Sequence, residues 1–304
     1  MRLLDILTSP WAIVPEKLFE IREIYFTHLR GEKINIKAIE EAIKVKIGKP
    51  LDNKSGRYQV INDTAVIPIQ GVIAKRMNLF MRIFFGGTST QYVGQDIKEA
   101  LADNSIKSIL LDIDSPGGTV DGTQELAQII FNGRNQKPVV AYSDGMIASA
   151  AYWIGSAADN IYISGDTIDV GSIGVVTEHV DYSKYDEKAG VKITEIYAGK
   201  YKRIASQNQP LTKEGKQYIQ DQVDYLYTIF VDEVARQRGV SSDIVLESMA
   251  DGRIFTGKQA ISAGLVDGVS TFDRLINTVL PVMQTEKADA QALAELNKSL
   301  RKEL

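Results

Sequence analysis

The sequence contains no cysteine, which excludes disulfides, thiolate nucleophiles and zinc sites with Cys ligands. Histidine is almost as scarce, because only His28 and His179 occur, and neither lies in an HExxH pattern. Two histidines without cysteine do not favour a metal centre, so we expect no metal and no cofactor. A hydrolase built from this chain would therefore need a base other than histidine.

The sequence also lacks an excess of positive charge and long apolar runs. The formal net charge of −4 argues against a nucleic-acid partner. No apolar stretch reaches the roughly 18 residues that a membrane span needs, so we expect none. The apolar run near the N-terminus is short and soon followed by charges, which is not typical of a secretory signal. We therefore expect a cytoplasmic protein.

From residue 59 onward the pattern alternates between strands and helices. A continuous apolar strand at 107–113 is typical of a strand buried on both faces, and such alternation predicts a mostly parallel sheet flanked by helices, an α/β fold. The expected strands are 64–73, 107–113, 138–143, 160–164, 172–176 and 192–197, and the expected helices include 89–103 and 123–133.

Composition divides the 304 residues into three parts. Residues 1–58 read as a charged helical lead-in, in which Pro15 can open a helix. Residues 59–275 form the expected main domain, with a long helix that runs to about Arg238. Residues 276–304 read as an amphipathic helical tail with leucines on one seam, namely Leu293, Leu296, Leu300 and Leu304.

Three segments carry the residue types of a hydrolytic site. The first is "DIDSPGG" at 112–118, where a strand ends and the chain turns through two glycines into a helix expected to begin near Thr119. Glycines leave backbone N–H groups free to face a ligand, and a helix N-terminus favours negative charge. The segment suits an oxyanion hole, although a plain tight turn has the same residues.

The second segment is "GMIASAAYWIG" at 145–155, which places Ser149 where a strand gives way to a helix. Its hydroxyl could project from the carboxyl edge of the sheet, where ligands of open α/β folds bind. The N–H of Ala150 would then be a second oxyanion donor. The alternative is a tightly packed buried helix.

The third segment is "YAGKYKRI" at 197–204, after an expected apolar strand. A lysine can act as a general base when burial lowers its pKa. Lys200 and Lys202 share one side of an extended chain, so spacing does not choose between them. A solvated lysine is the alternative for both.

Together the segments resemble the signal peptide peptidase A group of serine proteases, including its phage prohead protease branch of the lambda minor capsid protein C type. The matching motifs are "PIQGVI", "LDIDSPGG", "IASAAYWIGSAAD", "GSIGVV", "GKYK" and "DGRIFTGKQAISAGLVD". The resemblance implies a Clp protease/crotonase-like spiral of ββα units, with the helical lead-in and the amphipathic tail attached to it.

The resemblance also assigns roles to individual residues. It implies that Ser149 is the nucleophile and Lys202 the general base, oriented by Ser172. The oxyanion hole would consist of Gly118, together with Gly117, and the N–H of Ala150. One departure is that Ala150 and Ala151 follow the serine where the family usually has two glycines, which leaves the N–H in place but narrows the space for substrate.

The resemblance further implies a homo-oligomer that cleaves protein or peptide substrates. The lead-in "SPWAIVPEKLFEI" and the segment "FGGTST" favour a phage setting inside the procapsid, with scaffold and capsid proteins, and the protease itself, as substrates. The alternatives are a cellular signal-peptide peptidase, a crotonase-like acyl-CoA enzyme and a non-catalytic capsid-assembly protein. A thioesterase or hydratase assay and labelling by a serine-reactive phosphonate would separate them. The apolar segment 77–87 could line the substrate groove or a subunit contact.

Overall fold

The computed structural model describes residues 10–29, 58–77 and 87–303. Its centre is a six-stranded sheet in the order β13-β10-β8-β6-β3-β2, in which only the edge strand β2 is antiparallel to its neighbour. The mostly parallel sheet predicted from the sequence is therefore confirmed. Its strands are β2 (Gln59–Ile61), β3 (Thr64–Gln70), β6 (Ser108–Asp114), β8 (Val139–Ser143), β10 (Asn160–Ile163) and β13 (Gly268–Val269).

Both faces of this sheet are buried, because alternate residues of each strand enter different clusters. On β6, Leu111 packs into the main core beneath the helices, whereas Leu110 packs on the opposite face against Leu280. The helices beside the main core are α5 (Thr90–Ala102), α6 (Thr123–Gly133) and α7 (Ala150–Gly155). The opposite face is covered by α12 (Phe272–Arg274), η1 (Leu275–Val279) and the start of α13 (Leu280–Glu303).

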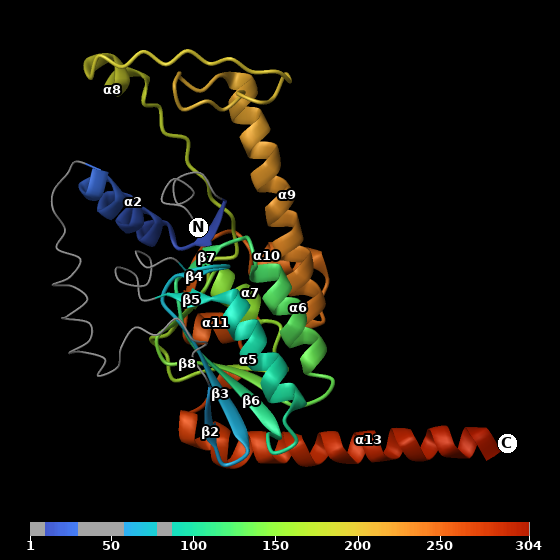
Figure 1. Cartoon of the computed structure of the whole chain (residues 1–304). Helices are drawn as coiled ribbons and strands as arrows, with labels where there is room; N and C mark the ends of the chain where they lie inside the picture. The colour runs from blue at the N-terminus through green and yellow to red at the C-terminus, as the bar shows by residue number, and fades with distance from the viewer. Residues whose placement is uncertain (1–9, 30–57, 78–86, 304) are drawn as a thin grey trace.

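Two smaller sheets lie at the carboxyl end of the central strands (Figure 1). One has the order β1-β7-β4-β5 and the other β12-β11-β9. The first contains β1 (Trp11–Ile13), β4 (Ile73–Ala74), β5 (Thr88–Ser89) and β7 (Gly117–Thr119), and the second β9 (Met146–Ala148), β11 (Asp169–Gly171) and β12 (Ile254–Thr256). These sheets meet around the start of α7, which places that helix end between them.

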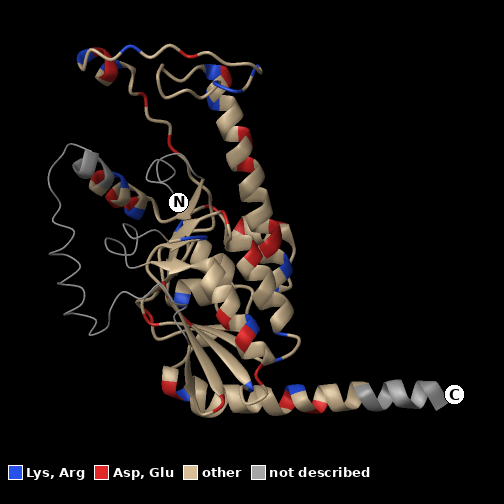
Figure 2. Ribbon diagram, in the orientation of Figure 1, with Lys and Arg blue, Asp and Glu red and all other residues tan. Residues whose placement is uncertain are grey.

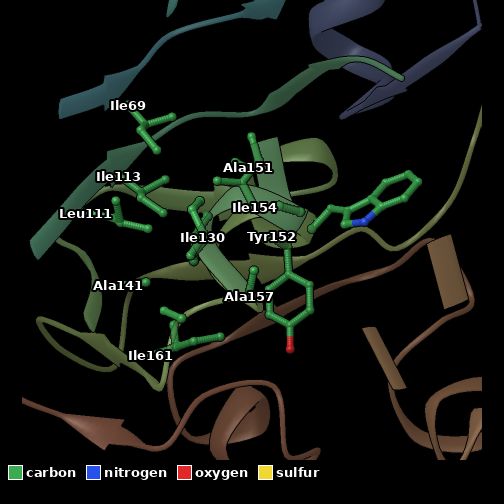
Figure 3. Close-up of a cluster of buried hydrophobic side chains, with 14 of the residues drawn as sticks. Ile69, Leu111, Ile113, Ile130, Ala141, Ala151, Tyr152, Ile154, Ala157 and Ile161 are labelled. Atoms are coloured by element: carbon green, nitrogen blue, oxygen red, sulfur yellow. The ribbon is translucent and has the colours of Figure 1, made fainter. Parts of the chain in front are cut away.

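Helix α7 is entirely buried, and Figure 3 shows its side chains among those of the sheet strands. Tyr152 donates its hydroxyl hydrogen to the Leu265 carbonyl at 2.9 Å. A Cβ on Gly155 would lie 2.5 Å from Ile147 Cδ1, so a side chain at this position would require Ile147 to shift. The alanine and glycine content of 145–155 therefore reflects close packing against the sheet.

The remaining helices extend from this body. The lead-in forms α2 (Pro15–Leu29), which begins at Pro15 as predicted, but residues 11–13 before it form a strand rather than helix. Helix α9 (Lys213–Arg238) ends at Gly239, whose φ of 68° provides the left-handed cap that the sequence predicts. The other short helices are α8 (Ser183–Lys188), α10 (Ser242–Ser248) and α11 (Lys258–Ser262).

Residues 177–225, which we term the arm, project away from the body (Figure 1). The arm comprises α8, an irregular stretch and the N-terminal half of α9, and within it only Ser206 and Gly215 are buried. Large apolar side chains on it are open to solvent, including Tyr185, Ile196, Tyr197 and Tyr225. The charged residues of the arm include both signs, as Figure 2 shows.

Candidate active site

Ser149 lies at the turn between β9 and α7, as the sequence predicts. Its φ of 56° and ψ of −120° are a conformation that side-chain-bearing residues rarely adopt. The turn is held in place because the Ser149 N–H donates to the Gly171 carbonyl at 2.6 Å and its carbonyl accepts from the Trp153 N–H at 2.9 Å. Strained backbone of this kind is concentrated at functional sites, where the surrounding structure enforces it.

The Ser149 hydroxyl is buried and unpaired. The residue is 1% exposed, and Oγ has no hydrogen-bond partner among the described residues. An unpartnered buried hydroxyl costs free energy, about 1–3 kcal/mol, so a purely structural role would favour alanine at this position. The strain and the missing partner together make Ser149 a candidate for a residue whose hydroxyl takes part in chemistry.

The glycine turn lies directly beside Ser149. A Cβ on Gly117, whose φ is +100°, would lie 2.9 Å from Ser149 Cβ, and a Cβ on Gly118 would lie 1.8 Å from the Ile73 carbonyl oxygen. The Gly117 N–H already donates to Ser115 Oγ at 3.1 Å. The Gly117 N–H is thus engaged within its own turn, whereas Gly118 lies opposite Ala12 of a neighbouring extended segment. Gly118 is therefore the better placed of the two glycines to supply an N–H to an extended ligand, with the Ala150 N–H at the start of α7 as its counterpart.

The turn does not lead into a helix, which corrects the sequence-based expectation. Residues 117–119 form β7, and α6 begins only at Thr123. Two glycines followed by a threonine resemble a helix start in sequence, but pairing with β1 and β4 extends the chain here. At the glycine turn, the N–H groups that could face an oxyanion therefore belong to a strand, whereas the Ala150 N–H lies at the start of a helix.

Ser172 lies on the other side of Ser149. It follows Gly171, which accepts the Ser149 N–H, and its own N–H donates to the Arg253 carbonyl at 2.8 Å. Ser172 has a φ of 52°, so it is a second serine with strained backbone next to Ser149. The expected strand at 172–176 is wrong, because only Val176 forms a bridge, to Trp11.

The two lysines lie in the arm, far from Ser149. The segment that carries them is at the end of α9 opposite to α7 (Figure 1). Lys202 is exposed, and the expected strand at 192–197 before it is irregular and mostly exposed. The structure thus brings together Ser149, Ala150, Gly117, Gly118 and Ser172 and does not place Lys202 with them.

Lys200 is engaged at the surface. Its Nζ lies 3.0 Å from Glu214 Oε1, and this hydrogen bond raises the pKa of Lys200 above its ordinary value. A raised pKa is the opposite of what a general base requires. Between the two lysines that spacing leaves open, Lys200 is therefore the less suitable.

Other sequence-based candidates do not enter the site. His179 Nε2 lies 3.0 Å from the Ser206 carbonyl oxygen, within the arm, and the side chain of His28 lies outside the described residues. So does the greater part of segment 77–87. In the described part of the chain, no helix combines the length and hydropathy needed to cross a bilayer, and no group of three or more His, Asp or Glu side chains could hold a metal ion.

The sequence reasoning missed β1. This strand lies along β7, next to Ser149, although residues 1–58 were expected to be helical. The four apolar residues 11–14 stand between Pro10 and Pro15. A short apolar run bounded by prolines is compatible with a strand, and this signal could have identified it.

Comparison with known proteins gives the family. The model of peptidase family S49 matches residues 132–285, a range that contains Ser149, Ser172 and Lys202. The head-tail preconnector protein GP5 of Enterobacteria phage P21 is 37% identical over 69% of this chain and 41% of its own length. Capsid assembly protease C of Escherichia phage lambda is 32% identical over 76% of this chain and 52% of its own.

The chain spans about half the length of these curated relatives. Among solved structures, a mutant of the 1510-N membrane-bound stomatin-specific protease has a TM-score of 0.44 and 16% identity, over 71% of this chain and 84% of that one. The family match covers just over half of the sequence. The chain belongs to peptidase family S49.

Proposed function

We propose that this chain is a serine endopeptidase in which Ser149 attacks a peptide carbonyl. The observation that carries the proposal is the strained, buried and unpartnered Ser149 beside the glycines of β7. The N–H groups of Gly118 and Ala150 flank this serine and can hold the oxyanion that forms when Oγ attacks. The hydroxyl proton must pass to a base, because a neutral serine is a weak nucleophile.

Lys202 is the base in this proposal, and it reaches Ser149 from a second copy of the chain. Within one copy the two residues are far apart, whereas the arm that carries Lys202 projects outward and exposes apolar side chains, among them Ile196 at 96% and Tyr225 at 68%. Such surface is normally covered by a partner. A closed ring of identical copies would cover every arm in the same way.

Docking also provides the environment that the chemistry needs. A lysine in water is almost entirely protonated near neutral pH, because its ordinary pKa is about 10.4. Burial between two copies would lower that pKa and release the amine as a base. In this proposal Ser172, which follows the residue that accepts the Ser149 N–H, orients the incoming amine by a hydrogen bond.

The substrates we propose are proteins of a phage procapsid, in a bacterial cytoplasm. The support is the names of two relatives, a capsid assembly protease and a head-tail preconnector protein. Cleavage of scaffold or capsid proteins, and of the protease itself, fits an enzyme whose activity depends on assembly.

Mixing two inactive variants tests the proposal. Ser149→Ala and Lys202→Ala should each lose peptide cleavage by on the order of a thousandfold, and Lys202→Arg should be equally inactive, because arginine does not release its proton. Lys200→Ala is the matched control on the same arm and should retain activity. If the dyad forms between copies, an equimolar mixture of Ser149→Ala and Lys202→Ala recovers part of the activity. A mixture as inactive as its components would contradict the intermolecular dyad, and an active Ser149→Ala variant would overturn the nucleophile.

A further inference from the structure

The strand β1 fills a slot that an extended peptide would need in order to reach Ser149. On one side it pairs antiparallel with β7, with Ala12 opposite Gly118. On the other side, the Trp11 N–H donates to the Val176 carbonyl at 2.9 Å, and the Val176 N–H donates back at 2.8 Å. The segment 10–14 is thus held between the two chain segments that flank the serine.

The register places Ala12 at the proposed oxyanion donor. The Val14 N–H donates to the Pro116 carbonyl, and the Val120 N–H donates to the Pro10 carbonyl. Hydrogen-bonded pairs alternate along an antiparallel ladder, so Ala12 and Gly118 form the hydrogen-bonded pair between these two. The Gly118 N–H therefore faces the carbonyl of Ala12.

The Ala12 carbonyl also lies close to the serine. Its oxygen is 2.3 Å from the position that a Cβ on Gly117 would occupy, and Ser149 Cβ is 2.9 Å from the same position. The serine hydroxyl is buried in this arrangement. A backbone carbonyl that faces Gly118 beside the nucleophile has the placement expected of a substrate carbonyl.

Side chains alternate along the strand as they would in a bound peptide. Trp11 and Ile13 pack into a separate apolar cluster with residues of α2 and β4. Ala12 belongs instead to the main core, together with Ala150. The side of the strand that faces α7 accordingly has space for a small residue, and the opposite side accepts large apolar ones.

We propose that the segment 10–14 is an intramolecular occupant of the peptide-binding groove, seated with Ala12 over Ser149, so that a substrate strand must displace it. The proposal rests on the function proposed above. It also defines the substrate class of the site: extended peptides that pair with β7, have a small residue at the serine and have large apolar residues on either side of it.

An engineered disulfide can test this in the full-length chain. The double variant Pro10→Cys with Val120→Cys joins a hydrogen-bonded pair of an antiparallel ladder, whose Cα separation of about 5.5 Å suits a disulfide. Because the sequence contains no cysteine, no other bond competes. The same protein with the bond reduced is the matched control, and both single variants control for the substitutions.

Two measurements are made on the oxidised and reduced forms. The first is the rate at which a fluorophosphonate labels Ser149, which should fall at least tenfold on oxidation and recover on reduction. The second is binding of a fluorescein-labelled peptide with the sequence of residues 9–15, in a Ser149→Ala background. We expect the peptide to bind the reduced form and not the oxidised form, and replacing its alanine by leucine should weaken binding at least tenfold.

The outcomes of the two measurements distinguish an error in the proposed nucleophile from an error in the proposed occupation of the groove. Absence of labelling in every form, with peptide binding that still depends on reduction, would refute the nucleophile and support the occupied groove. Labelling that is equally fast in both forms, or a peptide that binds both forms equally, would overturn the occupied groove. Trp11→Ala, which removes the largest side chain that anchors β1, should raise the labelling rate several-fold without any engineered bond, and an unchanged rate would count against the proposal.

Discussion

The indole of Trp153 stacks on the ring of Phe230, with centroids 4.4 Å apart and planes inclined by 10°. This contact joins α7, which begins directly after Ser149, to α9, whose N-terminal half belongs to the arm. Both side chains are fully buried. The helix that follows Ser149 and the helix that carries the arm are therefore anchored to each other.

The stacked pair should dominate the stability of this junction. We expect Phe230→Ala to lower the free energy of unfolding by about 3–5 kcal/mol, because it removes a fully buried aromatic ring. Thr228→Ala, at an exposed position of the same helix outside the arm, is the control and should change it by less than about 0.5 kcal/mol. Urea denaturation of both variants measures the difference. Similar values for the two would show that the stacking contributes little.

Gly118 should tolerate no side chain. In Gly118→Ala the new Cβ would approach the Ile73 carbonyl oxygen to 1.8 Å. Because this oxygen belongs to the backbone, the strand itself would have to shift. We expect loss of fluorophosphonate labelling and a lower melting temperature. Gly165→Ala is the control, because a Cβ there meets nothing within 4 Å. Labelling at the wild-type rate in Gly118→Ala would argue against this strand as part of the oxyanion hole.

Asp96 should make the stability depend on pH. It is buried, its Oδ1 has no hydrogen-bond partner among the described residues, and burial raises its pKa to about 6. The folded state therefore binds more protons than the unfolded state between pH 3.8 and about 6, so this group's contribution falls as pH rises through that window. Asp96→Asn should remove this component and stabilise the protein at pH 7.5, by about 1–3 kcal/mol. Thermal melts across pH 4–8 check this, and identical pH profiles would contradict it.

Truncation should separate the two parts of α13. Leu280 is fully buried against the sheet, and Gln284 donates to Ser108 Oγ at 3.0 Å, whereas Leu293 is 60% exposed. A chain that ends at residue 288 should keep its melting temperature and its peptide cleavage. A chain that ends at residue 279 should lose stability, because the apolar face of the sheet is uncovered. Loss of small-peptide cleavage in the chain that ends at residue 288 would show that the distal part of α13 belongs to the active domain.

The sequence predicted the elements whose pattern is local. Helix α9 has a helical apolar stripe and a glycine at its end, and β6 is a continuous apolar run, so both were recognised. The position of Ser149 between a strand and a helix was also predicted locally, whereas its role as nucleophile came from the family resemblance, because the segment alone is equally compatible with a tightly packed buried helix. These features depend on residues close together in the chain.

The features that the sequence did not predict depend on contacts between residues far apart in the chain. Strand β1 is three residues long, and its pairing with β7 joins residues more than 100 positions apart. The stretch before Lys200 has the residue pattern of a strand, but no strand within the described residues pairs with it. The location of Lys202 could not be predicted from the sequence for the same reason. The spacing of residues along the chain does not determine what a projecting arm contacts.

If β1 occupies the groove as proposed, its tether to the rest of the chain sets an equilibrium competition with substrates. A segment of the same chain competes for the groove at a local concentration that, for tethered ligands, reaches the millimolar range. A free peptide of micromolar affinity, present at low abundance, would rarely win that competition. Proteins packed at high density around the enzyme would win it often. The tether would thus confine cleavage to crowded surroundings and spare dilute proteins, without any additional recognition element.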